Sequence, residues 1–260
     1  MTNYVEQLSP RPGRKSLEKL IATLDGHPAV DNDFYRLWMS KPLGIKGLEV
    51  FVRNYGAFII SFPDAMSALI KVTHDLEAKT EHVKTLFSEM GYGNPQKLHS
   101  VLFDNFFSEL AKKLGHEGRL NRHRLERDLE LLPTTHQFID GESMLYGNKD
   151  PRIAVGAQLA QEWQAYTMLR QLYEGARNYM PLWERQDEFH EACEYYYVHI
   201  GAAEKDHKEE SISATMKFLT DEDDLDQVTY GFNMHLKIYV DFWEGIYNAI
   251  MAVDALRAGA

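Results

Sequence analysis

The chain has 260 residues, which is long enough for one large domain with a substantial core. Its formal net charge of −11 argues against a nucleic-acid binder, because such proteins carry a basic face. The single cysteine, Cys193, excludes an internal disulfide framework and a zinc site built from several thiolates.

Sequence signals for export are not apparent. The N-terminal stretch MTNYVEQLSPRPGRK lacks the apolar segment of a signal peptide. No apolar run approaches the roughly 20 residues that cross a bilayer, and one cysteine fits a reducing compartment. We therefore expect a cytoplasmic protein that binds neither membrane nor nucleic acid.

The first predicted elements follow a short arm over residues 1–14, which contains two prolines and a glycine. Helical periodicity then begins at Ser16, an expected N-cap, and a first helix stops at Gly26. Amphipathic segments follow over residues 31–41 and 48–62. We expect the latter helix to end at Phe62, with Pro63 in the first turn of a helix that runs to Gly91.

The stretch GYGNP at residues 91–95 is a strong helix breaker. Helical patterns continue beyond it over residues 95–115, 120–132, 134–147, 150–179, 181–219 and 221–256. The basic run EGRLNRHRLER, residues 117–127, is interpreted as a solvated helix face. No segment alternates with period two for long, so residues 15–260 are expected to form a single all-α domain of about seven to nine helices.

Acids and imidazoles on apolar helices are the candidates for chemistry, because a buried carboxylate without a partner costs several kcal/mol. Glu162 lies within IAVGAQLAQEWQAYTML, where a metal or a buried Arg or Tyr would satisfy it. Glu89 and His99 flank the GYGNP break, which can bring the end of one helix beside the start of the next. A core histidine is the alternative for His99.

A third candidate segment is YYYVHIGAAEKDHKEES, residues 195–211. In a regular helix His199 and His207 are about 80° apart, which is poor for joint ligation with Glu204. One extra residue in a π-bulge, which Gly201 would make sterically easy, aligns all three on one stripe. A regular helix would instead align His199 with Asp206. The remaining alternative is that His199 is a core residue and the others are solvent-exposed.

Together these segments supply three carboxylates and three imidazoles without thiolate, a set that suits two Fe(II) ions in a helical bundle. The predicted ligands are Glu89, His99, Glu162, His199, Glu204 and His207, with Asp206 as the alternative to His207.

The chain resembles the haem-oxygenase-like di-iron oxidases and oxygenases, also described as iron-containing redox enzymes. The resemblance rests on SEMGYGNPQKLHSVLF, AVGAQLAQEWQAY and the segment of residues 195–211, and it extends over roughly residues 15–255. The family has an acid four residues after the first His of its late motif and a second His seven after it. Here Ala203 and Asp206 fill those positions, and Glu204 and His207 each lie one residue later.

This resemblance implies a haem-oxygenase-like helical bundle, two Fe(II) per chain, a homodimer, and oxidation of a small carboxylate-bearing metabolite by O2 through a peroxo-di-iron(III) species. Amino acids and fatty acids are typical substrates of the family. Beyond the metal ligands no catalytic residue is predicted. The expected substrate-binding residues are Arg53, Phe103, Trp163, Tyr166 and Tyr195, although Arg53 could equally pair with a buried Glu.

The sequence leaves two other functions open. The first is a metal-free enzyme on the same scaffold, similar to the pyrroloquinoline-quinone-forming or thiaminase-II-like enzymes. The second is a non-catalytic helical interaction protein. Neither alternative explains why several acids lie on apolar helices.

Overall fold

The computed structural model describes residues 13–200 and 202–258, and the side chains of residues 199–200, 202–207 and 256–258 lie outside that description. The described part of the chain is all-α, as predicted, with twelve α-helices and four short 3-10 segments. The α-helices are α1 (Arg14–Ile21), α2 (Asp33–Ser40), α3 (Ile45–Val72), α4 (Leu76–Glu89), α5 (His99–Lys113), α6 (Arg122–Asp128), α7 (Pro133–Tyr146), α8 (Pro151–Ala176), α9 (Gln186–Ala192), α10 (Glu194–Ile200), α11 (Ala202–Met216) and α12 (Glu222–Ala258).

The helix count exceeds the predicted seven to nine, mainly because the segment of residues 181–219 forms three helices, α9, α10 and α11. The expected arm over residues 1–14 lies outside the described residues except for its last two. Arg14 already belongs to α1, whose N-cap is Gly13 and not Ser16.

The predicted helix boundary at Pro63 is wrong, because α3 runs without interruption from Ile45 to Val72. A proline inside a helix removes one hydrogen bond and costs about 3 kcal/mol. The apolar stripe of α3 continues on both sides of it, with Phe58, Phe62, Met66 and Leu69 buried. Burial of these four side chains, each worth about 1.5–3 kcal/mol, outweighs that cost.

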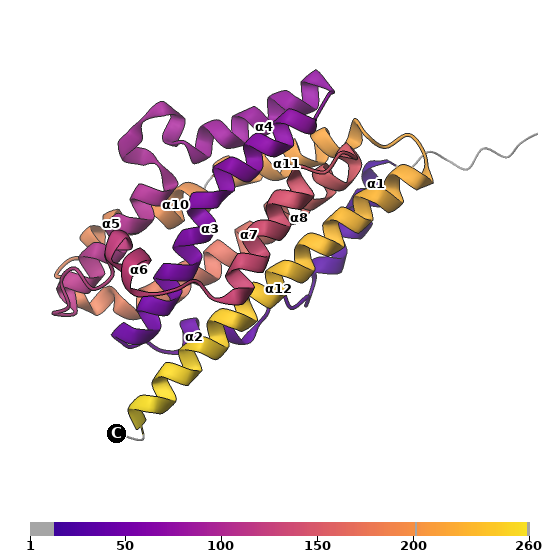
Figure 1. The fold of residues 1–260 in the computed structure, drawn as a ribbon. Coiled ribbons are helices and arrows are strands. Elements are labelled where there is room, and N and C mark those ends of the chain that lie inside the picture. Colours follow the sequence, from indigo (N-terminus) through magenta and orange to yellow (C-terminus); the bar gives the residue numbers. More distant parts are fainter. Residues whose placement is uncertain (1–12, 201, 259–260) are drawn as a thin grey trace, which may run out of the picture.

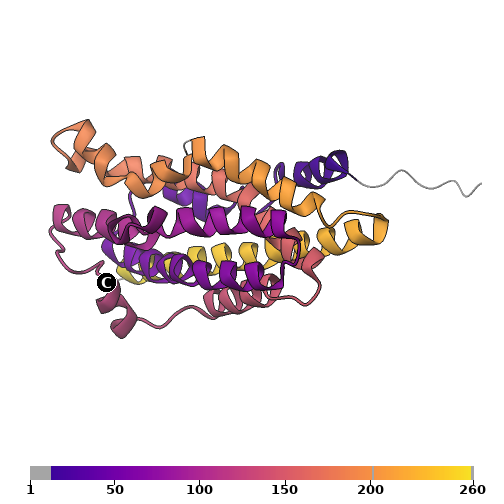
Figure 2. The same ribbon diagram turned by 90° about the horizontal axis from the view of Figure 1, so that it is seen from above.

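The helices α3, α7, α8 and α12 form the centre of the bundle (Figure 1). α12 packs along α8 and α7, and α3 packs against α7. On the other side α11 packs against both α8 and α4, as the view from above shows (Figure 2). The space between α3, α4, α8 and α10 therefore lies inside the bundle.

Helices α8 and α12 approach each other closely at two glycines. A Cβ atom on Gly156 would lie 2.1 Å from the carbonyl oxygen of Val228, and one on Gly231 would lie 2.0 Å from that of Ile153. No side chain fits at either position without backbone movement. The two glycines therefore fix the relative position of these helices.

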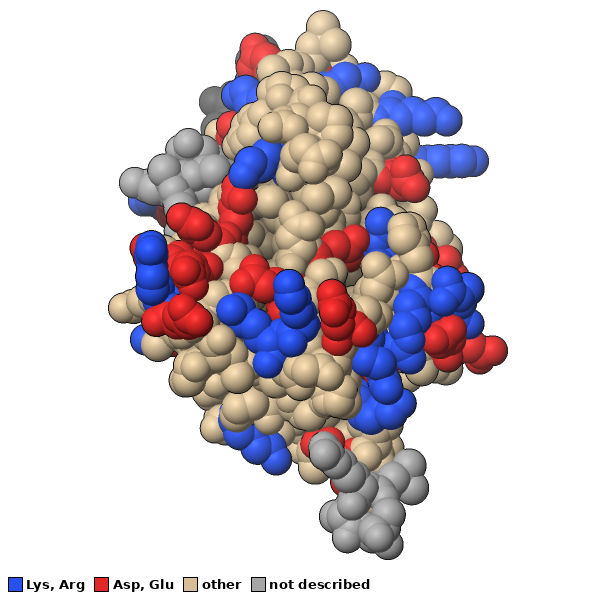
Figure 3. Space-filling view, turned by 90° about the vertical axis from the view of Figure 1, so that its left-hand side faces the viewer, with Lys and Arg blue, Asp and Glu red and all other residues tan. Residues whose placement is uncertain are grey.

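The basic run of residues 117–127 forms ion pairs and is not simply solvated. Arg119 and Arg124 both contact the buried Glu49, at 2.7 and 2.8 Å, and Arg122 contacts Asp104 at 2.8 Å. Figure 3, which faces the end of the bundle that carries α5 and α6, shows basic and acidic side chains side by side. This face offers no uniformly basic surface.

By length and composition, α3 is the one helix of the described chain that could cross a membrane. A buried core helix passes the same test, and other helices cover much of this one.

Candidate metal site

The predicted contact between Glu89 and His99 is present in the structure. Glu89 ends α4 and His99 begins α5, and the His99 Nδ1 atom lies 2.7 Å from Glu89 Oε2. Both side chains are largely buried, with 13% and 6% of their surface exposed. Two residues ten apart in sequence therefore direct a carboxylate and an imidazole into one small volume.

The turn between α4 and α5 explains this geometry. Gly91, Tyr92 and Gly93 have φ values of 63°, 54° and 81°, a left-handed conformation that glycine adopts most easily. A Cβ atom on Gly91 would lie 2.4 Å from the backbone carbonyl carbon of Lys97. The chain can thus reverse sharply only because glycine occupies position 91.

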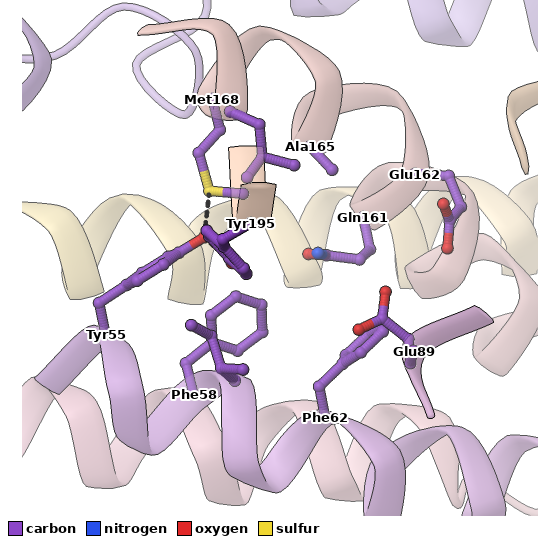
Figure 4. A pocket seen from close by; sticks show the side chains of 11 residues that line it. Tyr55, Phe58, Phe62, Glu89, Gln161, Glu162, Ala165, Met168 and Tyr195 are labelled. Atoms are coloured by element: carbon purple, nitrogen blue, oxygen red, sulfur yellow. Dashed lines mark hydrogen bonds between the residues drawn. The ribbon is translucent and has the colours of Figure 1, made fainter. Parts of the chain in front are cut away.

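The third predicted ligand, Glu162, projects from α8 and is 5% exposed. Gln158, one turn earlier on the same helix, donates a hydrogen bond from Nε2 to Glu162 Oε1 at 3.1 Å. Figure 4 shows the carboxylates of Glu162 and Glu89 facing the same space from opposite walls. The structure therefore brings three of the predicted ligands, Glu89, His99 and Glu162, into one part of the bundle.

Glu89 and Glu162 line a cavity of about 40 Å³, which has room for a few atoms or ions of water size. Its lining includes aromatic and aliphatic side chains from three helices and the amide of Gln161. No lysine or arginine is among the described residues that line it. The described lining residues are Tyr55, Phe58, Ile59, Phe62, Glu89, Gln161, Glu162, Ala165, Met168, Leu169 and Tyr195.

The remaining predicted ligands, His199, Glu204 and His207, and the alternative Asp206, have side chains outside the described residues. The backbone of α11 can still be placed. Glu77 pairs with Lys217, and Lys84 lies 3.6 Å from Glu210, so α4 and α11 are antiparallel.

Extending this antiparallel pairing toward the end of α4 sets Glu89 beside the first turns of α11, which contain positions 204–207. The predicted bulge falls at Gly201, which also lies outside the described residues. Both the later ligands and the bulge therefore stay predictions.

Of the predicted substrate-binding aromatic residues, Tyr195 lines the cavity. Its hydroxyl shares a 2.9 Å hydrogen bond with that of Tyr55. Phe103 packs behind this pair, with its ring 5.4 Å from the ring of Tyr195. Trp163 and Tyr166 turn toward α11, where Lys208 lies over their rings at 5.0 and 4.3 Å.

The prediction that Arg53 binds substrate in this pocket is not supported by its position. Its Nε donates to the carbonyl oxygen of Leu129 at 3.0 Å, and it lines a separate surface groove with His136. Arg53 precedes Tyr55 by two positions, about 200° around the helix, so the two side chains leave α3 in nearly opposite directions.

Two buried ionisable residues near the cavity were not predicted. Glu142 on α7 and His235 on α12 are both fully buried. His235 Nε2 donates to Gln161 Oε1 at 3.0 Å. A signal for Glu142 exists in the sequence, since Thr135, Phe138, Glu142 and Tyr146 follow helical spacing and all are buried.

The chain matches a known family in sequence and several solved structures in fold. A family model described as "iron-containing redox enzyme" matches residues 49–240. No curated protein matches the chain. Several solved structures share its fold at low sequence identity.

A CADD-like protein of unknown function from Nostoc punctiforme is 12% identical, with a TM-score of 0.71 over 90% of this chain and 96% of that one. A TenA homologue from Pseudomonas syringae is also 12% identical, with a TM-score of 0.69 over 95% and 98%. A domain of unknown function from Shewanella denitrificans, described as having a heme oxygenase-like fold, is 10% identical, with a TM-score of 0.65 over 95% of each chain. These likenesses confirm the predicted haem-oxygenase-like fold.

Proposed function

Because the chain belongs to the family of iron-containing redox enzymes, we propose that its cavity binds two ferrous ions and that the protein uses O2 to oxidise a small carboxylate-bearing metabolite. The observation that carries this proposal is that Glu89 and Glu162 line one cavity and that His99 contacts Glu89 at its edge. The proposed partners are the substrate and O2, and the proposed assembly is a cytoplasmic homodimer.

The donor set fits iron. Two carboxylates in one low-dielectric cavity repel each other unless positive charge lies between them. Iron bound between Glu89 and Glu162 would supply that positive charge. Carboxylate oxygen and imidazole nitrogen without thiolate are ligands that iron accepts in helical bundles.

Glu89, His99 and Glu162 would hold iron from the α4, α5 and α8 side, and His199, Glu204 and His207 are the proposed ligands from α10 and α11. Bound ferrous iron supplies the electrons that activate O2.

The protein side chains prepare the site for this chemistry. Gln158 orients the carboxylate of Glu162 by its hydrogen bond, and Glu89 orients the ring of His99. Phe58, Ile59, Phe62 and other apolar lining residues exclude bulk water. The Tyr55–Tyr195 pair places two hydroxyl groups near the acids.

Metal uptake tests the proposal. Metal-free protein is titrated with Fe(II) without oxygen, and we expect about two equivalents to bind. Glu162→Ala should lose at least one equivalent, since one ligand is removed from a shared site. Glu174→Ala, a change of an exposed residue on the same helix, is the matched control and should bind as the wild type does. Wild-type protein that takes up no iron, with or without substrate, would contradict the proposal.

The substrate class is tested by oxygen consumption. The iron-loaded protein is supplied with O2 and a panel of amino acids and fatty acids, and consumption should rise with one class. The fold alone is shared with a protein described as a TenA homologue, so a metal-free reaction on this scaffold is the second candidate. Catalysis that survives complete removal of iron would favour it.

A further inference from the structure

A second group of buried polar side chains lies behind the cavity. It consists of Glu142 and Tyr146 on α7, Gln161 and Gln164 on α8, and His235 on α12, and each is at most 5% exposed. Gln161 Oε1 accepts hydrogen bonds from His235 Nε2 at 3.0 Å and from Gln164 Nε2 at 2.9 Å. Since Nε2 of His235 carries the proton, its Nδ1 atom is left as an acceptor.

This group lies at the same level of the bundle as the cavity. The ring of Tyr146 is 6.3 Å from the ring of Phe62, which lines the cavity, and 6.3 Å from the ring of His235. Gln161 connects the cavity with the group of buried polar side chains, because it lines the cavity and binds His235. Glu142 precedes Tyr146 by one helical turn and therefore projects from the same face of α7.

Several polar atoms of this group have no hydrogen-bond partner within the described part of the protein. They are both carboxyl oxygens of Glu142, the hydroxyl of Tyr146, Nδ1 of His235 and Oε1 of Gln164. Buried polar atoms are almost always bonded, to protein or to ordered water. Nδ1 of His235 and Oε1 of Gln164 can only accept, whereas the Tyr146 hydroxyl can donate or accept. Water, which both donates and accepts, is the partner that suits this group.

The charge state of Glu142 follows from its surroundings. The ionisable groups around it include Tyr146 on its own helix and Tyr239 on α12. The ring of His235 lies against Tyr146, and Glu162 of α8 and Glu89 of α4 lie beyond Tyr146. On the α3 side the neighbours of α7 include Phe58 and Phe62.

None of these neighbours offers a positive charge. Burial lowers the pKa of His235 to about 3, so its ring is neutral, and burial raises the pKa of Glu142 to about 8. Glu142 thus holds a proton at neutral pH.

We propose that Glu142 is the internal proton donor of the cavity and that its proton travels through water held among Glu142, Tyr146 and His235. The proposal rests on the proposed function, because the reduction of O2 consumes protons inside a cavity whose described lining is mainly apolar. The proton leaves the carboxyl oxygen of Glu142 and passes along O–H groups to oxygen that is reduced in the cavity. No electron moves in this step, and solvent returns a proton to the Glu142 carboxylate before the next turnover.

Infrared spectroscopy of the metal-free protein gives a first test that needs no activity. The carbonyl stretch of a protonated carboxylic acid should be visible at pH 7, absent in Glu142→Gln and retained in Asp140→Asn. Asp140 is exposed on the same helix. A wild-type spectrum at pH 7 without that band would overturn the proposal whatever the protein does with iron.

The second test follows the reaction of iron-loaded protein with O2 by stopped flow. Glu142→Gln should slow the proton-consuming phase by roughly a hundredfold while binding as much Fe(II) as the wild type. Glu142→Asp, which keeps the acid, should restore most of the rate. Tyr146→Phe should also slow this phase, and it serves as the second variant if Glu142→Gln does not fold.

The outcomes separate this inference from the proposed function. Wild-type rates in both Glu142→Gln and Tyr146→Phe, with iron uptake intact, would overturn the proton route and leave the iron site standing. A normal infrared band in a protein that takes up no iron would instead contradict the proposed function.

Discussion

Replacing Glu142 with glutamine should change how the stability of the protein depends on pH. Burial raises the pKa of Glu142 from 4.5 to about 8. Between these values the folded protein binds more protons than the unfolded chain, so the free energy of unfolding falls as pH rises. Integrating this difference in bound protons from pH 5 to pH 7 gives the contribution of Glu142. The free energy of unfolding falls by about 2–3 kcal/mol over that range. Glutamine has no proton to lose, so Glu142→Gln lacks this decline.

The assay is equilibrium unfolding in urea at pH 5, 6 and 7 for both proteins. The unfolding free energy of Glu142→Gln minus that of the wild type should increase by about 2–3 kcal/mol from pH 5 to pH 7. Effects of all other ionisable groups cancel in this comparison if they are the same in both proteins. Asp140→Asn, an exposed change on α7, should keep the wild-type pH dependence. A difference between Glu142→Gln and wild type that stays constant with pH would refute the reasoning.

Three further predictions concern other parts of the molecule. Gly231→Ala should lower the free energy of unfolding by about 3 kcal/mol or more in urea titrations, because its methyl group would meet the carbonyl oxygen of Ile153. Gly56→Ala, whose Cβ would make an ordinary contact at 3.5 Å, should be far milder. Arg53→Ala should bind as much Fe(II) as the wild type when it is titrated without oxygen, since Arg53 lines a different groove. Nitrogen NMR should show His235 neutral down to pH 5, because burial lowers its pKa to about 3.

The helical fold was predictable because apolar residues recur with helical spacing along nearly the whole chain. The exact helix boundaries were not, as Pro63 shows. Local preference places a boundary there, whereas Phe62, Met66 and Leu69 bury a continuous stripe that holds α3 together. Packing in the assembled bundle overrides this local preference, and such packing cannot be read from a short stretch of sequence.

The site was predictable where a local turn determines it. Glu89 and His99 are joined by a turn that requires glycine at position 91, so their proximity follows from ten residues of sequence. Glu162 could be identified because it interrupts an apolar helix.

The direction of a side chain was harder to predict than its helix. Trp163 follows Glu162 by one residue, about 100° around the helix, and so faces α11 instead of the cavity. The role of His235 could not be predicted, because its contact with Gln161 joins α8 and α12, which lie far apart in sequence. The burial of Glu142, in contrast, is indicated by the helical spacing of its buried neighbours on α7.

The glycine contacts at positions 156 and 231 limit how the cavity can grow. α8 carries Glu162 and cannot come closer to α12, since their backbones already touch. A larger substrate must therefore gain room on the opposite wall, where Phe58, Ile59 and Phe62 of α3 line the cavity. Variant libraries meant to alter substrate size should vary these three positions and leave the α8–α12 side untouched.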